Sequence, residues 1–247
     1  SIYASPLDDL IDFRFDERVV DVFPDMIQRS VPGYATIISS IGIFAAKYAQ
    51  ENSHCYDLGC SLGAVTLSMR QRIKQQNCDI IAVDNSLAMI ERGQKLLASD
   101  LSSTIPVTMI CADINDVEIE NASVVVMNFT LQFIPLEERL ALITRIYKGL
   151  KPGGVLILSE KIAFEDDKVN DQQIDWYHNF KRANGYSDLE VSQKRSALEQ
   201  VLLAEPMSVH HQRLEAAGFE QSHMWYQCFN FVSLLAFKSS TPTTPKV

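Results

Sequence analysis

Two glycines and two acids give the first indication of chemistry in this chain. The run Asp57-Leu58-Gly59-Cys60-Ser61-Leu62-Gly63 follows a short apolar segment and precedes a helical pattern. Glycine lets the backbone turn sharply and approach a ligand without a Cβ in the way, and the helix start presents free N–H groups to that ligand. A further acid, Asp84, ends the next apolar run, where it can accept hydrogen bonds from ribose hydroxyls. The pattern predicts a nucleoside-binding α/β site.

Other reactive residue types give weaker indications. Cys60 lies near a predicted helix N-terminus, which lowers a thiol pKa, but the sequence places no base beside it, so a nucleophilic role is disfavoured. The histidines at 210, 211 and 223 lack ligand spacing, and we expect no metal. The five cysteines contain no C-x-x-C pair, which predicts reduced thiols in a cytoplasmic protein.

The elements that must position these residues alternate through the middle of the chain. Helical patterns at 64–76, 87–98 and 136–150 separate strand-like runs at 54–58, 79–83, 106–111, 123–128 and 155–159. The run 124–127 is apolar without alternation, as expected for a strand that is buried on both faces. Strands that alternate with helices predict a parallel, doubly wound sheet.

Helical segments flank this alternation. Residues 8–50 are predicted to form an N-terminal helical cap, broken at Pro32-Gly33. The four residues Lys151-Pro152-Gly153-Gly154 are predicted to form a turn before the fifth strand. Residues 163–206 are polar and predominantly helical in pattern, and we expect an insertion there that serves as a lid or a dimer contact.

The end of the chain defines the fold class. After a helix at 210–217, the runs 219–227 and 229–238 are too close for a crossover connection, so they must form an antiparallel hairpin. Five alternating units with such a hairpin are typical of the Rossmann-like class I S-adenosylmethionine (SAM) methyltransferase fold, with seven strands. A dinucleotide dehydrogenase would continue with a second mononucleotide half. We expect one SAM-binding domain over residues 1–238 and a disordered tail at 239–247.

Within that fold, residues after the third and fourth predicted strands are candidates for ligand binding. Asp113 can accept a hydrogen bond from the adenine amine while Ile114 packs on the ring, and Asn128 lies beneath the methionine portion. Plainer roles stay open: Asp113 as a solvated loop acid, and Asp84 as a helix cap, a role that Asn85 or Ser86 can fill. The aromatic residues Phe129 and Phe133 are interpreted as packing.

Length and charge restrict the remaining function classes. At 247 residues the chain fits one large α/β domain. A net charge of −9 argues against broad nucleic-acid binding, although a local basic patch around Lys181-Arg182 or Lys194-Arg195 stays open. No apolar run approaches the roughly 20 residues of a membrane span, and the N-terminus lacks a secretory pattern. We therefore expect neither membrane nor direct nucleic-acid binding.

Longer strings resemble one family in particular. The chain is similar to the bacterial carboxy-S-adenosyl-L-methionine synthases up to Lys238, and the matching strings lie at 15–19, 23–34, 57–63, 128–133, 180–187, 192–196 and 227–231. The glycine loop alone would be weak support; the strings in the insertion make it specific. The resemblance implies that SAM and prephenate give carboxy-SAM, phenylpyruvate and water, and that a partner enzyme uses carboxy-SAM to carboxymethylate the tRNA wobble uridine.

The resemblance also implies which residues line the ligand site. Arg195 would bind the new carboxylate, from the neighbouring subunit of a homodimer if it acts in trans, because a fixed guanidinium suits a carboxylate. From spacing alone, Arg195 is equally a surface charge on a helix at 189–203. The implied site comprises Tyr34, Gly59, Cys60, Ser61, Asp84, Asn85, Asp113, Ile114, Asn128 and Arg195.

Two rival functions remain open from the sequence. A true SAM-dependent methyltransferase of a small molecule or tRNA fits residues 50–160 equally well, and only the insertion and Arg195 disfavour it. A non-catalytic module that stores or delivers a SAM derivative is the second rival. The implied partners are prephenate, a second copy of the chain and, functionally, a tRNA carboxymethyltransferase.

Overall fold

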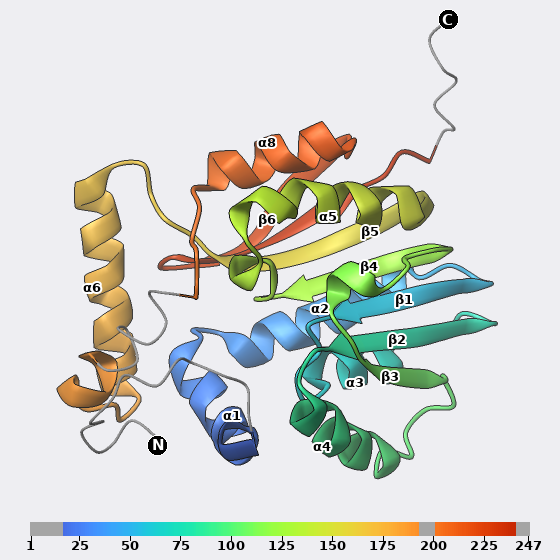
Figure 1. Cartoon of the computed structure of the whole chain (residues 1–247), viewed down its shortest axis with the longest axis horizontal. Coiled ribbons are helices and arrows are strands. Elements are labelled where there is room, and N and C mark those ends of the chain that lie inside the picture. The colour runs from blue at the N-terminus through green and yellow to red at the C-terminus, as the bar shows by residue number, and fades with distance from the viewer. Residues whose placement is uncertain (1–16, 193–200, 241–247) are drawn as a thin grey trace, which may run out of the picture.

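A mixed seven-stranded sheet forms the centre of the computed structural model, which describes residues 17–192 and 201–240 (Figure 1). The strand order is β3-β2-β1-β4-β5-β7-β6, and β7 runs antiparallel to both of its neighbours. The predicted hairpin and fold class are therefore confirmed. The strands are β1 Ser53–Leu58, β2 Cys78–Asp84, β3 Val107–Cys111, β4 Ala122–Asn128, β5 Leu150–Lys161, β6 Gln221–Cys228 and β7 Phe231–Phe237.

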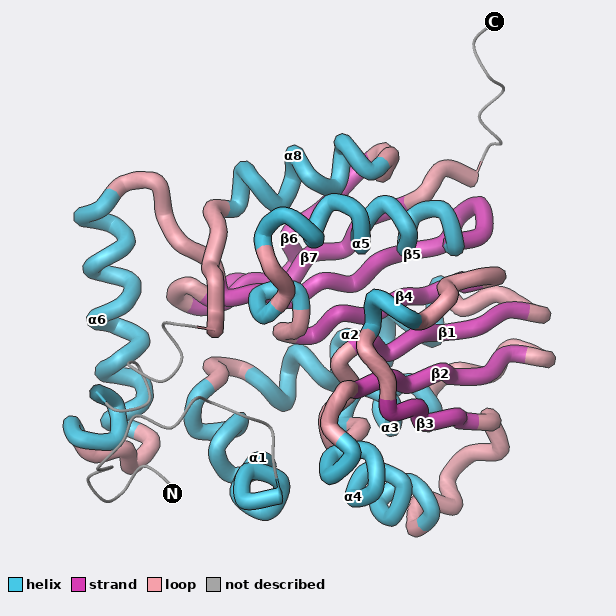
Figure 2. The backbone as a smooth tube through the Cα atoms, viewed as in Figure 1, coloured by secondary structure: helices cyan, strands magenta, loops and turns pink. Residues whose placement is uncertain are grey.

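Helices cover both faces of the sheet (Figure 2). On one face α2 and α3 pack against it, and on the other α5 and α8 do so. Two short 3-10 helices, η1 Ile114–Asp116 and η2 Leu131–Phe133, follow β3 and β4. The helices are α1 Glu17–Ser30, α2 Tyr34–Tyr48, α3 Ala64–Arg70, α4 Leu87–Ala98, α5 Leu136–Gly149, α6 Asp167–Ala183 and α8 Met207–Ala217. No helix within the described ranges is long and apolar enough to cross a membrane.

The central strand β4 shows why the sheet needs both layers. Its residues 124–127 are all fully buried. Val124 and Val126 pack into the core on the α2 side, whereas Val125 and Met127 pack into the core on the α5 side. Successive side chains of a strand point to opposite faces, so an apolar run without alternation needs cover on both. This confirms the interpretation of that run.

Two predicted boundaries were wrong. The four residues 151–154 lie inside β5, where the pairing with β4 shifts between Ala122 and Val124 and Gly153 takes a φ of +75°. They form a bulge in a continuous strand rather than a separate turn. The helix expected over 64–76 ends at Arg70. Beyond it the Arg72 side chain donates to the Ser68 carbonyl at 3.2 Å, and Ile73 turns into the core.

The insertion after β5 begins and ends at the same place. Ala163 pairs with Pro206 in a parallel bridge, and the Ala163 N–H donates to the Glu205 carbonyl at 3.2 Å. Between them α6 stands apart from the sheet, beyond α1 (Figure 1). Tyr186, after α6, anchors the insertion to α1 because its hydroxyl bonds the Ser30 hydroxyl at 3.0 Å. The insertion therefore leans on the helix that covers the carboxyl edge of the sheet.

Candidate functional site

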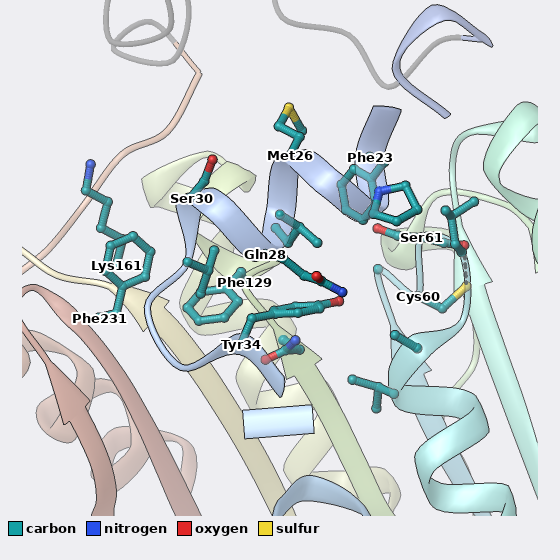
Figure 3. A pocket seen from close by; sticks show the side chains of 18 of the residues that line it. Phe23, Met26, Gln28, Ser30, Tyr34, Cys60, Ser61, Phe129, Lys161 and Phe231 are labelled. Atoms are coloured by element: carbon teal, nitrogen blue, oxygen red, sulfur yellow. Dashed lines mark hydrogen bonds between the residues drawn. The ribbon is translucent and has the colours of Figure 1, made fainter. Parts of the chain in front are cut away.

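A cavity of about 320 Å³ lies at the carboxyl ends of β1, β4 and β5 (Figure 3). In open α/β sheets ligands bind outside this edge, so the position is the expected one. Helix α1, with Phe23 and Met26, lies above in the view of Figure 3, and the Tyr34 ring lies below this helix near the middle of the view. Residues from the strand ends and from the insertion complete the wall. The polar and charged side chains that line it come from Gln28, Ser30, Tyr34, Asp57, Cys60, Ser61, Asn128, Gln132, Lys161 and Tyr177.

The glycine loop forms one end of the cavity. Gly59 has a φ of +80°, a conformation that L side chains rarely adopt. A Cβ on Gly59 would lie 2.2 Å from Thr130 Oγ1, and that hydroxyl donates to the Leu58 carbonyl at 2.9 Å. The N–H groups of Gly59 and Cys60 both donate to the Val83 carbonyl of β2, at 2.8 and 2.9 Å. Both the conformation and the space therefore require glycine.

Asp84 fixes the same loop from the neighbouring strand. Its carboxylate accepts the Ser61 N–H at 2.9 Å and the Ser86 N–H at 2.9 Å. Ser61 takes a φ of +48°, a left-handed backbone conformation that glycine adopts more readily than serine. The Ser86 hydroxyl accepts the Met89 N–H and caps α4. Asp84 thus holds the loop rather than capping the helix, and its own burial raises its pKa.

Asp57 lies beneath this loop and faces the cavity. Its side chain is 1 % exposed and accepts a hydrogen bond from Thr66 Oγ1 at 2.6 Å. Burial raises the pKa of Asp57 to about 7, because a buried carboxylate loses its hydration. The cavity floor therefore carries a carboxyl group that gains or loses its charge close to neutral pH.

Asn128 provides an acceptor for a ligand. It ends β4 and lines the cavity. Its Oδ1 is buried and has no hydrogen-bond donor among the residues that the structure describes. A buried polar atom without a partner is costly, and a donor on a ligand would satisfy it. Asn128 and the loop therefore fit a ligand that carries an N–H donor.

Cys60 does not act as a nucleophile in this geometry. Its burial, together with the nearby carboxylates of Asp57 and Asp84, raises the thiol pKa far above its usual value. The thiol is therefore protonated and unreactive at neutral pH. All five cysteines are free thiols. Within residues 17–192 and 201–240, no cluster of three or more histidine, cysteine, aspartate or glutamate side chains could hold a metal.

The structure brings half of the predicted site together in the cavity wall. Tyr34, Gly59, Cys60, Ser61 and Asn128 all line it. The remaining described members lie at the ends of the neighbouring strands, at the same edge of the sheet and outside the cavity wall: Asp84 ends β2 and Asn85 follows it, and Asp113 and Ile114 follow β3. Asp113 caps η1 through the Asn115 N–H at 2.8 Å. Arg195 lies outside the described residues.

Several lining residues were not predicted from the sequence. Lys161 ends β5, Tyr177 comes from α6, and Phe231 begins β7. Phe129 was interpreted as packing, yet it lines the cavity with a φ of +59°. A charged residue close to the end of a buried apolar run was the available signal for Lys161. Tyr177 and Phe231 gave none, because their approach depends on the hairpin and the insertion.

A buried ionic cluster lies next to Gln132, one of the residues that line the cavity. Arg139, which is fully buried, donates to the Leu203 carbonyl at 2.9 Å and to the Gln132 carbonyl at 3.1 Å, and it pairs with Glu205. Arg213 binds both oxygens of Glu205 at 2.6 and 2.7 Å. Burial alone would raise the pKa of Glu205, but the two arginines outweigh it and hold that pKa below its ordinary range. The cluster therefore ties the returning end of the insertion to η2.

The fold is that of the class I SAM-dependent methyltransferases. A family model described as a methyltransferase domain matches residues 56–154. An O-methyltransferase family protein from Burkholderia thailandensis superposes with a TM-score of 0.65 at 19 % identity, over 92 % of this chain and 61 % of that chain. At that identity the likeness shows the shared fold.

Two relatives define the family within that class. Carboxy-S-adenosyl-L-methionine synthase from Geobacter sp. (strain M21) is 70 % identical over 96 % of this chain and 97 % of its own length. The protein of the same name from Geobacter metallireducens is 70 % identical over 96 % of this chain and 98 % of its own. The chain therefore belongs to the carboxy-S-adenosyl-L-methionine synthase family and is a SAM-using transferase.

Proposed function

We propose that this protein converts SAM and prephenate into carboxy-SAM, phenylpyruvate and water. The observation that carries the proposal is the 70 % identity, over nearly the full length, to proteins named for that product. The cavity supports it: one end is built for a nucleoside-bearing ligand, and the other carries a cation. As a consequence, the cytoplasmic product would supply a tRNA carboxymethyltransferase.

The proposed reaction balances without an external base. Prephenate loses its ring carboxylate as carbon dioxide and its hydroxyl as hydroxide, and the ring becomes aromatic to give phenylpyruvate. The hydroxide removes a proton from the methyl group on the sulfonium and becomes water. A new carbon–carbon bond then joins that methyl carbon to the carbon dioxide. The protein contributes mainly position and electrostatics, since both reactive species come from one substrate.

Different residues in the described part of the chain would hold different parts of the substrates. The loop at 59–61, held by Asp84, would fix the nucleoside portion of SAM, and Asn128 would accept a hydrogen bond from its ammonium group. The mostly apolar wall would limit the access of water, which would otherwise return a proton to the deprotonated methyl carbon. Arg195, from the same chain or from the second subunit of a homodimer, is proposed to bind the new carboxylate.

A conventional methyltransferase is the second candidate. Two observations favour it: the match to a methyltransferase domain and the fold shared with O-methyltransferases. An enzyme that transfers a methyl group would give the same match and the same fold. The two candidates predict different products from SAM. One retains the methyl carbon and carboxylates it, whereas the other transfers it and leaves the demethylated product.

Mass spectrometry separates these candidates. We would incubate the purified protein with SAM and prephenate and measure phenylpyruvate and SAM-derived species against a reaction without protein. We expect phenylpyruvate and a SAM derivative heavier by one carboxyl group, in equal amounts. Absence of phenylpyruvate above the protein-free background would contradict the proposal. The mass of any ligand that co-purifies with the protein gives an independent test.

A further inference from the structure

The end of the cavity opposite the glycine loop has a distinct composition. Lys161 and Phe231 lie across the cavity from Cys60 and Ser61, with Phe129 between them in the view of Figure 3. The rings of Phe129 and Phe231 meet edge to face with centroids 5.8 Å apart, and those of Tyr177 and Phe231 lie 4.9 Å apart. These three rings form an apolar box with one basic side chain at its edge.

The charges of the lining separate along the cavity. Among the described lining residues, Lys161 is the only cation and Asp57 the only anion. Asp57 is on β1 and Lys161 on β5, with β4 between these strands in the sheet. The ammonium groups of Lys161 and Lys181 lie 4.9 and 4.5 Å from the centroid of the Tyr177 ring. Two ammonium groups therefore lie beside one ring of the aromatic end.

This local charge matters because the protein as a whole is acidic. With a net charge of −9, the overall field repels an anionic substrate. An anion must then be held by a nearby cation in a partly desolvated site, where charge–charge attraction is stronger than in water. An aromatic box alone would favour a cation such as a sulfonium. Lys161 reverses that preference and makes the box suitable for an anion.

Rigid elements hold the backbone of Lys161. Its N–H donates to Gln132 Oε1 at 2.9 Å, and the residue pairs with Phe231 across the β5–β7 ladder. The next residue, Ile162, donates its N–H to the Asn230 carbonyl at 2.8 Å. A fixed backbone limits the positions that the ammonium group can reach, which favours a defined subsite over a chance surface charge.

We propose that Lys161, Phe129, Tyr177 and Phe231 form the subsite for the carboxylate-bearing, cyclic co-substrate. The Lys161 ammonium binds one carboxylate, and the three rings pack against the carbocycle. The proposal rests on the proposed function, in which prephenate is a cyclic molecule with two carboxylates. It assigns co-substrate binding to the end of β5, whereas SAM binding depends on the loop after β1.

The test compares two lysines on the same strand. In Lys161→Met the stem is retained and the charge removed; Lys151→Met, at the other end of β5, is the matched control. Steady-state kinetics would give the KM for prephenate, and calorimetry the Kd for SAM. We expect Lys161→Met to raise that KM about 10- to 100-fold, the range for one hydrogen bond to a charged group, and to leave the Kd for SAM within about twofold. Lys161→Arg should recover part of the loss.

The outcomes separate this proposal from the proposed function. If the wild-type protein is active and the Lys161→Met variant keeps the wild-type KM for prephenate, the proposed subsite is wrong and the proposed function stands. An equal loss of SAM affinity in that variant would show a general structural role and also overturn it. If the wild-type protein makes no carboxy-SAM, the proposed function fails. Calorimetric titration of prephenate into the SAM-loaded protein then decides the subsite: weaker binding by Lys161→Met supports it, and equal binding contradicts it.

Discussion

The two ends of the cavity differ in whether backbone groups or side chains form the site; we call the end at the loop 59–61 the backbone-built end and the end at Lys161, Tyr177 and Phe231 the side-chain-built end. At the β1 end, backbone groups and a left-handed loop shape the site, and Asp84 accepts two N–H groups to hold that loop. At the β5 end, side chains from β5, α6 and β7 meet, and a cation and three rings define the surface. The difference teaches where function can vary. An end formed by backbone groups can hold the same ligand whatever the reaction, whereas an end formed by side chains can select the reaction.

Gly59→Ala should break the backbone-built end most severely. The added Cβ would lie 2.2 Å from Thr130 Oγ1 in a residue at φ +80°, so the loop must move. We expect SAM affinity to fall at least about 1000-fold, equivalent to about 4 kcal/mol. Calorimetry with SAM measures it.

Gly153→Ala is the matched control, since Gly153 also has a positive φ but lies in the β5 bulge with its nearest contact at 3.2 Å. That variant should lose about 1–2 kcal/mol of stability from backbone strain while it keeps its SAM affinity. Comparable loss of SAM binding in both variants would show that strain alone, and not the loop, explains the effect.

Asp57→Asn should change how the stability of the protein depends on pH, because it removes the buried carboxyl group beneath the loop. Burial raises the pKa of Asp57 to about 7 from 3.8, so this group contributes stability that is present at low pH and is lost as the pH rises through about 7. The Asn variant has no such loss. Its free energy of unfolding relative to wild type should therefore increase between about pH 4 and pH 8, by up to about 4 kcal/mol.

Denaturant unfolding at several pH values measures this difference. A constant offset between the two proteins across the range would mean that Asp57 titrates as it does in the unfolded chain. That result would show that burial does not raise the pKa of Asp57 in the folded protein.

Asn128→Ala should affect ligand binding more than folding. Its Oδ1 has no donor within the described part of the chain, so its loss should change stability by less than about 1 kcal/mol. SAM affinity should fall about 10- to 100-fold if that oxygen accepts a hydrogen bond from the SAM ammonium group.

Ser123→Ala on the same strand is the comparison for Asn128. The Ser123 hydroxyl bonds that of Ser53 at 2.7 Å, far from the cavity, so its removal should lower stability by about 1 kcal/mol and leave SAM affinity unchanged. The reverse pattern, with Asn128→Ala destabilised and SAM binding intact, would contradict the assignment of Asn128 to the ligand.

Cys60→Ser should have the smallest effect. The Cys60 thiol is buried and protonated, and the variant keeps the backbone N–H of residue 60 that donates to the Val83 carbonyl and holds the loop. We expect kcat to change by less than about threefold, whereas loss of a covalent nucleophile costs several orders of magnitude. Steady-state kinetics on the variant measure it, and a collapse of kcat would require a chemical role for the thiol.

The sequence predicted the backbone-built end better than the other. Helix α4 has the predicted bounds, Leu87–Ala98, because Ser86 supplies a local cap and apolar spacing supplies the face. The glycine loop is likewise encoded within seven consecutive residues. The wall of Lys161, Tyr177 and Phe231 depends on contacts between distant segments, for which one sequence offers no local signal. The bulge at 151–154 was missed because a glycine-rich turn and a strand bulge use the same residues.

The fate of the ring carboxylate of prephenate tests the central claim most directly. Prephenate labelled with carbon-13 in that carboxylate would be incubated with SAM and the protein, and the SAM-derived product analysed by mass spectrometry. We expect a carboxylated SAM that carries the label, together with unlabelled phenylpyruvate. A product that lacks the label, or a demethylated SAM product in its place, would contradict carboxyl transfer and favour a conventional methyltransferase.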